Sequence, residues 1–135
     1  MNYLLHNRQK FYESVLPRIP DADLRSAIQA IETHGQAAKL DLTEDVSDAK
    51  NLFHIDLEDA VKKPNYGEKS GMTALYAQEV LERALRLEEL CYLAYSGKKD
   101  KDSVQMIDFI SFRIKRLRLL LDNLRYHRIR LGKGT

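Results

Sequence analysis

The stretch from Ser103 to Leu131 restricts the fold more than any other part of the chain. Its apolar residues recur at alternating spacings of three and four, which places them along one side of a helix: Ile107, Ile110, Ile114, Leu117, Leu121 and Leu124. A helix of this length extends roughly 40 Å at 1.5 Å per residue. Because a single helix cannot cover its own apolar stripe, the rest of the chain has to supply partner helices.

Two of these partners are expected in the first third of the chain. The first covers about residues 3–16 and ends at Pro17 and Pro20, because proline lacks the amide proton and restricts the residue before it. Asp21 or Asp23 then provides the N-cap of a second helix over residues 22–42. The short corner between them predicts an antiparallel hairpin.

A third helix is expected over residues 73–96 and the fourth over residues 103–131. The third ends at Gly97, where glycine permits a left-handed residue after the helix. Asp102 or Ser103 is expected to cap the fourth helix. The short loop between these two helices predicts a second antiparallel hairpin.

Residues 43–72 lack a sustained helical pattern and contain Pro64, Gly67 and Gly71. Short helical turns are expected around Asp48–His54 and Asp56–Val61. A connection this long suits a segment that crosses from one end of a bundle to the other. The predicted fold is therefore all-α: a single domain over residues 1–135, built as a four-helix bundle of two antiparallel hairpins joined by a long crossover.

Composition narrows the class of protein. No apolar run approaches the 18 or so residues of a membrane span, and the N-terminus does not resemble a signal peptide. The single cysteine, Cys91, excludes an internal disulfide, so a cytoplasmic protein is expected. The net charge is +2, but residues 103–135 carry eight Lys/Arg against two Asp, a balance of +6 that leaves −4 elsewhere. This asymmetry indicates either that the basic segment pairs with acidic residues of the same chain or that it binds an acidic partner.

Three polar residues interrupt the apolar faces and form a candidate buried polar cluster: Arg8, His34 and Glu88. One interpretation is a polar site inside the bundle, where a partly buried glutamate acts as an acid or a base. The other is an Arg8–Glu88 ion pair at the core margin, with the histidine at its edge. We favour the ion pair, because charges at helix edges are common.

Metal and catalytic signatures are weak. Di-iron bundles use Glu-x-x-His motifs, and the sequence contains none. His54 and Glu58 are four residues apart and share a face if that segment is helical; with Glu88 and His34 they are the only candidate metal ligands. No phosphate-binding glycine-rich loop or Cys-x-x-Cys pair occurs. We therefore expect no catalytic residues, no metal and no cofactor, and an enzyme is not favoured.

The order of elements resembles the ferritin-like fold, and its rubrerythrin-type members in particular. KFYESVLPRIPDADLRSAIQAIETHGQAAKL resembles the first hairpin of that family, and EELCYLAYSG the start of the second. The resemblance implies metal ligands at defined positions of the four helices. Glu88 is the one residue of this chain that matches such a position. At the others the chain has Leu5, Gly35, Ala38 and the stretch Phe112–Leu117. The resemblance thus implies a member without the di-metal centre, and oxidase or peroxidase activity is not carried over.

The favoured function is a non-catalytic interaction or scaffold protein that self-associates or binds a protein partner. Its candidate interface residues lie off the main seam of the last helix: Phe109, Phe112, Leu119 and Tyr126.

Two alternatives stay open. The basic end of the last helix could contact nucleic-acid phosphates through Arg113, Arg116, Arg125, Arg128, Arg130 and Lys133, although a solvated basic face explains the same charges. A ferritin-like metal-binding or redox protein would use Glu88 and His34. A small apolar ligand held between helices near Gly35, where a side chain is missing, is a further possibility.

Overall fold

The computed structural model describes residues 3–19, 21–42, 57–61 and 73–134, and these form helices and turns with no strand. The helices are α1 (Tyr3–Val15), the 3-10 helix η1 (Leu16–Arg18), α2 (Ala22–Glu32), α4 (Thr73–Tyr95) and α5 (Lys101–Gly134). Residues 57–61 are also helical. The prediction of an all-α fold is confirmed for this part of the chain.

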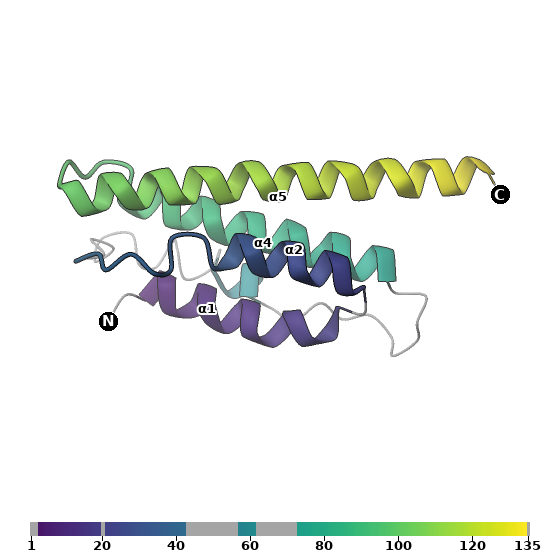
Figure 1. The fold of residues 1–135 in the computed structure, drawn as a ribbon, viewed down its shortest axis with the longest axis horizontal. Helices are drawn as coiled ribbons and strands as arrows, with labels where there is room; N and C mark the ends of the chain where they lie inside the picture. Colours follow the sequence, from purple (N-terminus) through teal and green to yellow (C-terminus); the bar gives the residue numbers. More distant parts are fainter. Residues whose placement is uncertain (1–2, 20, 43–56, 62–72, 135) are drawn as a thin grey trace.

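Helix α5 is 34 residues long and packs antiparallel against α4 (Figure 1). It begins after Asp100, whose carboxylate accepts a hydrogen bond from the backbone N–H of Ser103 at 3.0 Å. This bond holds the pKa of Asp100 below its ordinary value. The prediction of Asp102 or Ser103 as the cap was wrong, because the helix starts two residues earlier than expected. Asp102 instead accepts the backbone N–H of Asp41 at 2.8 Å.

Helix α1 ends where the prolines were expected to end it, and Pro17 lies within η1. The N-cap of α2 is Asp21, whose side chain accepts the backbone N–H of Leu24 at 2.9 Å. Helix α1 packs mainly against α4, whereas α2 packs against α5. Helices α1 and α5 run in one direction and α2 and α4 in the other (Figure 1). Each of these two packed pairs is therefore antiparallel.

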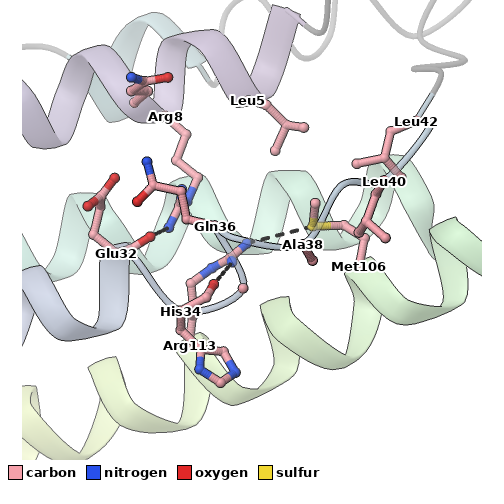
Figure 2. Close-up of a pocket in the computed structure, with 12 residues that line it drawn as sticks. Leu5, Arg8, Glu32, His34, Gln36, Ala38, Leu40, Leu42, Met106 and Arg113 are labelled. Carbon is pink, nitrogen blue, oxygen red and sulfur yellow. Dashed lines mark hydrogen bonds between the residues drawn. The ribbon is translucent and has the colours of Figure 1, made fainter.

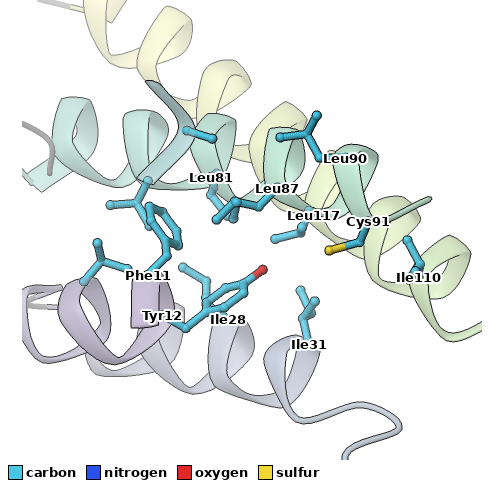
Figure 3. Packing of buried hydrophobic residues seen from close by; sticks show 14 of the residues in the cluster. Phe11, Tyr12, Ile28, Ile31, Leu81, Leu87, Leu90, Cys91, Ile110 and Leu117 are labelled. Carbon is cyan, nitrogen blue, oxygen red and sulfur yellow. The ribbon is translucent and has the colours of Figure 1, made fainter. Parts of the chain in front are cut away.

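Helix α4 contributes most to the apolar core that the four helices share (Figure 3). Its buried apolar residues recur at helical spacings over a wide arc: Val80, Leu81, Ala84, Leu87, Leu90, Cys91 and Tyr95. Each fully buried leucine contributes about 1.5–3 kcal/mol relative to an exposed one. Leu57 and Ala60 of the helical residues 57–61 join the same core. The position of α4 is thus set by burial on several sides.

Helix α2 is shorter than the sequence pattern predicted. The pattern extended it to residue 42, but the helix ends at Glu32 with Thr33 as its C-cap. Gly35 follows in the left-handed region at a φ of 84°. A Cβ atom at Gly35 would lie 2.6 Å from the Phe109 ring of α5, so the backbone turns directly against that ring. The helical pattern of residues 33–42 fails because this turn docks on α5 instead of continuing.

Gly97 does not have the left-handed conformation that was predicted for it. Gly35 is the glycine with a positive φ among the described residues, and no atom lies within 4 Å of a Cβ built on Gly97. The loop that ends α4 therefore needs no special backbone geometry at this position.

The predicted crossover, residues 43–72, lies outside the described residues except for 57–61. The helical turn expected around Asp56–Val61 is present in those five residues, and the one expected around Asp48–His54 is among the residues not described. In the described part of the chain, no helix combines the length and apolar character needed to span a membrane.

We predict that Gly35→Ala lowers the free energy of unfolding by at least about 2 kcal/mol. A left-handed conformation costs a residue with a Cβ about 1–2 kcal/mol, and the methyl group also displaces the Phe109 ring. Gly97→Ala is the matched control and should change the free energy by less than about 0.5 kcal/mol. Urea unfolding followed by circular dichroism measures both, and equal effects would contradict this account of the turn.

Candidate functional site

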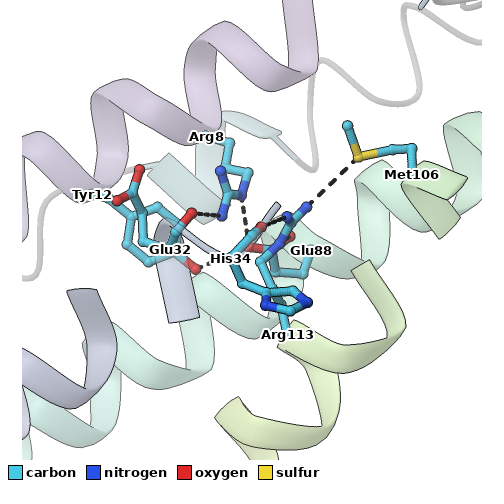
Figure 4. A network of polar contacts seen from close by, with 7 residues as sticks. All are labelled: Arg8, Tyr12, Glu32, His34, Glu88, Met106 and Arg113. Atoms are coloured by element: carbon cyan, nitrogen blue, oxygen red, sulfur yellow. Dashed lines mark hydrogen bonds and ion pairs between the residues drawn. The ribbon is translucent and has the colours of Figure 1, made fainter. Parts of the chain in front are cut away.

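The carboxylate of Glu88 is the centre of a buried polar cluster (Figure 4). Glu88 lies on α4 with 0% of its surface exposed. Its Oε2 accepts the Nε–H of Arg8 at 2.7 Å, and its Oε1 accepts the Nε–H of Arg113 at 2.9 Å. The hydroxyl of Tyr12 donates a third hydrogen bond to Oε2 at 3.1 Å. One carboxylate therefore connects α1, α4 and α5.

The two arginines extend this connection to the end of α2. Nη2 of Arg8 donates to the backbone oxygen of Glu32 at 2.8 Å, and Nη1 of Arg113 donates to that of His34 at 2.9 Å. The last carbonyls of a helix lack intrahelical donors and carry partial negative charge. The guanidinium groups satisfy these carbonyls, so they hold the turn after α2 against the other three helices.

Two members of the cluster, Arg8 and Tyr12, have shifted pKa values in the folded protein. Burial alone lowers the pKa of Arg8, but the charge and hydrogen bond of Glu88 outweigh it and leave the pKa above its ordinary value. Burial, with the neighbouring Glu88 carboxylate, raises the pKa of Tyr12 well above 10. Arg8 is thus a cation and Tyr12 a neutral donor. Two guanidinium groups facing one carboxylate give the cluster a net charge of +1.

Arg8 and Glu88 meet as an ion pair, whereas the side chain of the third predicted member, His34, does not join them. His34 contributes only its backbone oxygen, and its ring stacks on Phe112 with the ring centroids 3.9 Å apart. The sequence interpretation missed Arg113, which was assigned to the basic surface. Its spacing gave a signal, because Arg113 lies three residues after Ile110 and four before Leu117, both fully buried.

This arrangement does not suit the predicted alternative of an acid–base site. Both oxygens of Glu88 accept hydrogen bonds from charged groups, and the residue is closed to solvent. A proton-transfer group has to reach the proton that it moves. Within the described residues, Glu88 instead has the surroundings of a structural counter-ion.

The candidate metal ligands do not come together in the described part of the chain. Arginines surround Glu88, and the His34 ring packs against Phe112. Glu58 is exposed on residues 57–61, and His54 lies outside the described residues. No group of three or more His, Cys, Asp or Glu side chains there is positioned to hold a metal ion.

The predicted phosphate-contacting face is also incomplete. Arg113 is only 3% exposed, so it cannot contact a phosphate at the surface; it faces inward because Glu88 and the end of α2 bind its guanidinium group. Arg125 pairs with Glu82 at 3.0 Å. The guanidinium carbon of Arg116 lies 5.1 Å from the centre of the Phe112 ring. The side chains of Arg128, Arg130 and Lys133 are outside the described residues.

Three of the four candidate interface residues are exposed on α5: Phe112 at 37%, Leu119 at 55% and Tyr126 at 59%. The fourth, Phe109, is partly covered, because the Gly35 backbone and the His34 ring pack against it. Beside the exposed residues lies a groove of about 470 Å³ between α2 and α5. The groove is lined by Ala27, Ala30, Ile31, His34, Phe112, Arg116, Leu119, Leu120 and Asn123.

A separate cavity of about 240 Å³ lies on the other side of the turn after α2 (Figure 2). Arg8 and Arg113 form part of its wall, as do apolar side chains from α1, α5 and the segment after the turn. Its lining comprises Leu5, Arg8, Gln9, Glu32, His34, Gly35, Gln36, Ala38, Leu40, Leu42, Met106 and Arg113. The structure thus has a pocket near Gly35, although the Phe109 ring, and not an empty space, faces the missing side chain.

Comparison with known proteins does not assign the chain to a family. No protein-family model, no curated protein and no solved structure matches it.

We predict that Glu88→Gln destabilises the fold by about 3–5 kcal/mol, since removing one partner of a buried ion pair leaves uncompensated charge in the core. Glu82→Gln is the matched control on the same helix. Glu82 pairs with Arg125 near the surface, and losing such a pair costs about 0–1 kcal/mol. Chemical unfolding measures both variants. A loss of under 1 kcal/mol for Glu88→Gln would contradict a central role of the cluster.

We further predict that Tyr12 contributes to the loss of stability at alkaline pH. The raised pKa of Tyr12 means that the folded chain keeps a proton that the unfolded chain releases above about pH 10. Its contribution is therefore complete below pH 10. Above it, stability falls by up to about 1.4 kcal/mol per pH unit until the folded-state pKa is reached. Tyr12→Phe should decline less steeply than the wild type above pH 10, and parallel declines would contradict the assignment.

Proposed function

We propose that this protein is a non-catalytic interaction module that binds an amphipathic helix of a partner protein, apolar on one side and acidic along its flanks. The helix docks in the groove between α2 and α5. The observation that carries the proposal is a row of exposed apolar side chains beside that groove, with cations on either side.

The row has the period of a helix–helix contact. Phe112, Leu119 and Tyr126 are seven residues apart, so each is rotated only about 20° from the previous one around α5. An amphipathic helix laid along α5 can contact all three, as helices do in groove-type recognition. All three are exposed, which is unusual for consecutive large apolar side chains on one face.

The groove supplies the second wall of the docking site. Ala27 and Ala30 of α2 are small, so a partner helix can approach the backbone of α2 closely. The Phe112 ring stacks on the His34 ring, with the ring centroids 3.9 Å apart, and the Arg116 guanidinium carbon lies 5.1 Å from the centre of the Phe112 ring. These contacts keep the ring in a defined orientation before a partner arrives, which reduces the ordering cost of binding.

Charge selects the partner. Lys115, Arg116 and Arg118 are exposed next to the apolar row, against Asp108 and Asp122. A partner with carboxylates beside its apolar stripe complements these cations, which favours fast association and the correct register. A second copy of this chain, docked by two-fold symmetry on the same face, would bring two basic surfaces together. An acidic partner helix is therefore favoured over self-association.

The other predicted functions have less support. Of the six cations assigned to nucleic-acid phosphates, Arg113 is buried and Arg125 pairs with Glu82. The redox alternative relied on Glu88 and His34, whose side chains face different neighbours.

We also propose how the helices are connected and where the protein is located. The parallel directions of α2 and α4 support a long crossover between two hairpins, as in ferritin-like bundles. A cytoplasmic location is proposed because the sequence has one cysteine, Cys91, which is buried, and therefore no internal disulfide.

The test uses two synthetic helical peptides with the same leucine heptads, one flanked by glutamate and the other by lysine. We expect the full-length chain to bind the glutamate peptide in fluorescence anisotropy, and the affinity to fall with rising salt. Leu119→Gln should weaken binding at least about tenfold, because it places a polar amide at the centre of the contact.

Leu93→Gln is the matched control, since Leu93 is 56% exposed against 55% for Leu119 but lies on α4 away from the groove. It should leave the affinity unchanged. Equal binding of both peptides, or equal effects of the two substitutions, would contradict the proposal. Sedimentation that shows a dimer disrupted by Leu119→Gln would identify a second copy as the occupant instead.

A further inference from the structure

We propose that the cavity beside Arg8 and Arg113 binds a small monocarboxylate, with the carboxylate on the two guanidinium groups and a short hydrocarbon chain along the apolar wall. This site is separate from the α2–α5 groove and does not depend on the proposed function.

The arginines have donor capacity that the described residues do not use. A guanidinium group carries five N–H donors. Arg8 and Arg113 each donate one hydrogen bond to Glu88 and one to a backbone oxygen. Nη2 of Arg113 reaches only the sulfur of Met106, at 3.9 Å, which is a weak acceptor. The remaining donors of the pair have no oxygen acceptor among the described residues.

The charge balance points to an anion. Two cations and one carboxylate leave one positive charge among Arg8, Arg113 and Glu88, which are at most 8% exposed. Glu32 also lines the cavity, but it is only partly buried, so solvent screens its charge more than that of the buried cluster. The carbonyls at the end of α2 offset part of that charge through their dipoles. A bound carboxylate would neutralise the remainder and accept two parallel hydrogen bonds from a guanidinium edge.

The apolar part of the cavity indicates which group is attached to the carboxylate of the ligand. Figure 2 shows the guanidinium groups toward one end of the cavity and Leu5, Leu40, Leu42 and Met106 toward the other. An inorganic anion would occupy only the polar end, whereas an alkyl chain also covers the apolar wall. At about 30 Å³ per water-sized group, 240 Å³ holds roughly eight non-hydrogen atoms. Hexanoate has this size.

The test titrates the full-length protein with sodium hexanoate at constant ionic strength. It is followed by NMR at the Met106 methyl group and the Nε–H of Arg113. We expect saturable shifts at both, with a Kd on the order of 1 mM or lower for a ligand of this size. Hexan-1-ol, which has the chain without the charge, and inorganic phosphate, which has the charge without the chain, should each bind at least about tenfold more weakly.

Ala38→Phe fills the cavity without changing the arginines and should lower the affinity for hexanoate at least about tenfold. Ala37→Phe is the matched control, because Ala37 is exposed and does not line the cavity. Leu40→Gln tests the apolar wall with a milder change, in case Ala38→Phe perturbs folding. It should weaken hexanoate and leave phosphate unchanged.

The absence of saturable shifts up to about 10 mM hexanoate would overturn the proposal. Equal binding of hexan-1-ol would show an apolar pocket with no role for the arginines, and tighter binding of phosphate would show a simple anion site. Either result overturns the monocarboxylate assignment. The peptide assay of the α2–α5 groove uses different residues, so each hypothesis can fail without the other.

Discussion

The buried carboxylate of Glu88 determines how the helices are held together. It bonds Arg8 of α1 and Arg113 of α5, and these arginines bind the carbonyls at the end of α2. Charges closed to solvent are tolerated only when their partners are close and well oriented. This requirement restricts how α1, α2 and α5 can slide along α4, which apolar packing by itself restricts much less. The cluster therefore holds the helices together and also fixes their positions along one another.

The turn after α2 is the element that gives the molecule its two concave surfaces. Gly35 packs on the Phe109 ring, the backbone oxygen of His34 accepts from Arg113, and the ring of His34 stacks on Phe112. One side of this turn faces the cavity with the two arginines, and the other faces the α2–α5 groove. Because both surfaces share this turn, its conformation affects the shape of each.

The positive charge of α5 is divided between two environments. Arg113 is turned inward, where it compensates Glu88, and Arg116 and its neighbours remain at the surface beside exposed apolar side chains. A net charge counted along the sequence does not make this distinction. For that reason the basic character of α5 is better explained by one structural cation and a mixed apolar and basic surface than by a continuous phosphate-binding face.

The sequence by itself determined the approximate positions of the helices, the proline break after α1 and the apolar stripes of α4 and α5, because these follow from helical periodicity and local backbone chemistry. It favoured an Arg8–Glu88 ion pair over an acid–base site, but it did not determine that pair. It could not determine where α2 ends, that Arg113 turns inward, or that the His34 ring leaves the polar cluster. These features depend on groups far apart in the chain: Arg113 and His34 are separated by 79 residues, and Arg8 and Glu88 by 80. Only the tertiary structure decided them, since a helix end is set by the partners that satisfy its carbonyls, and those partners came from α1 and α5.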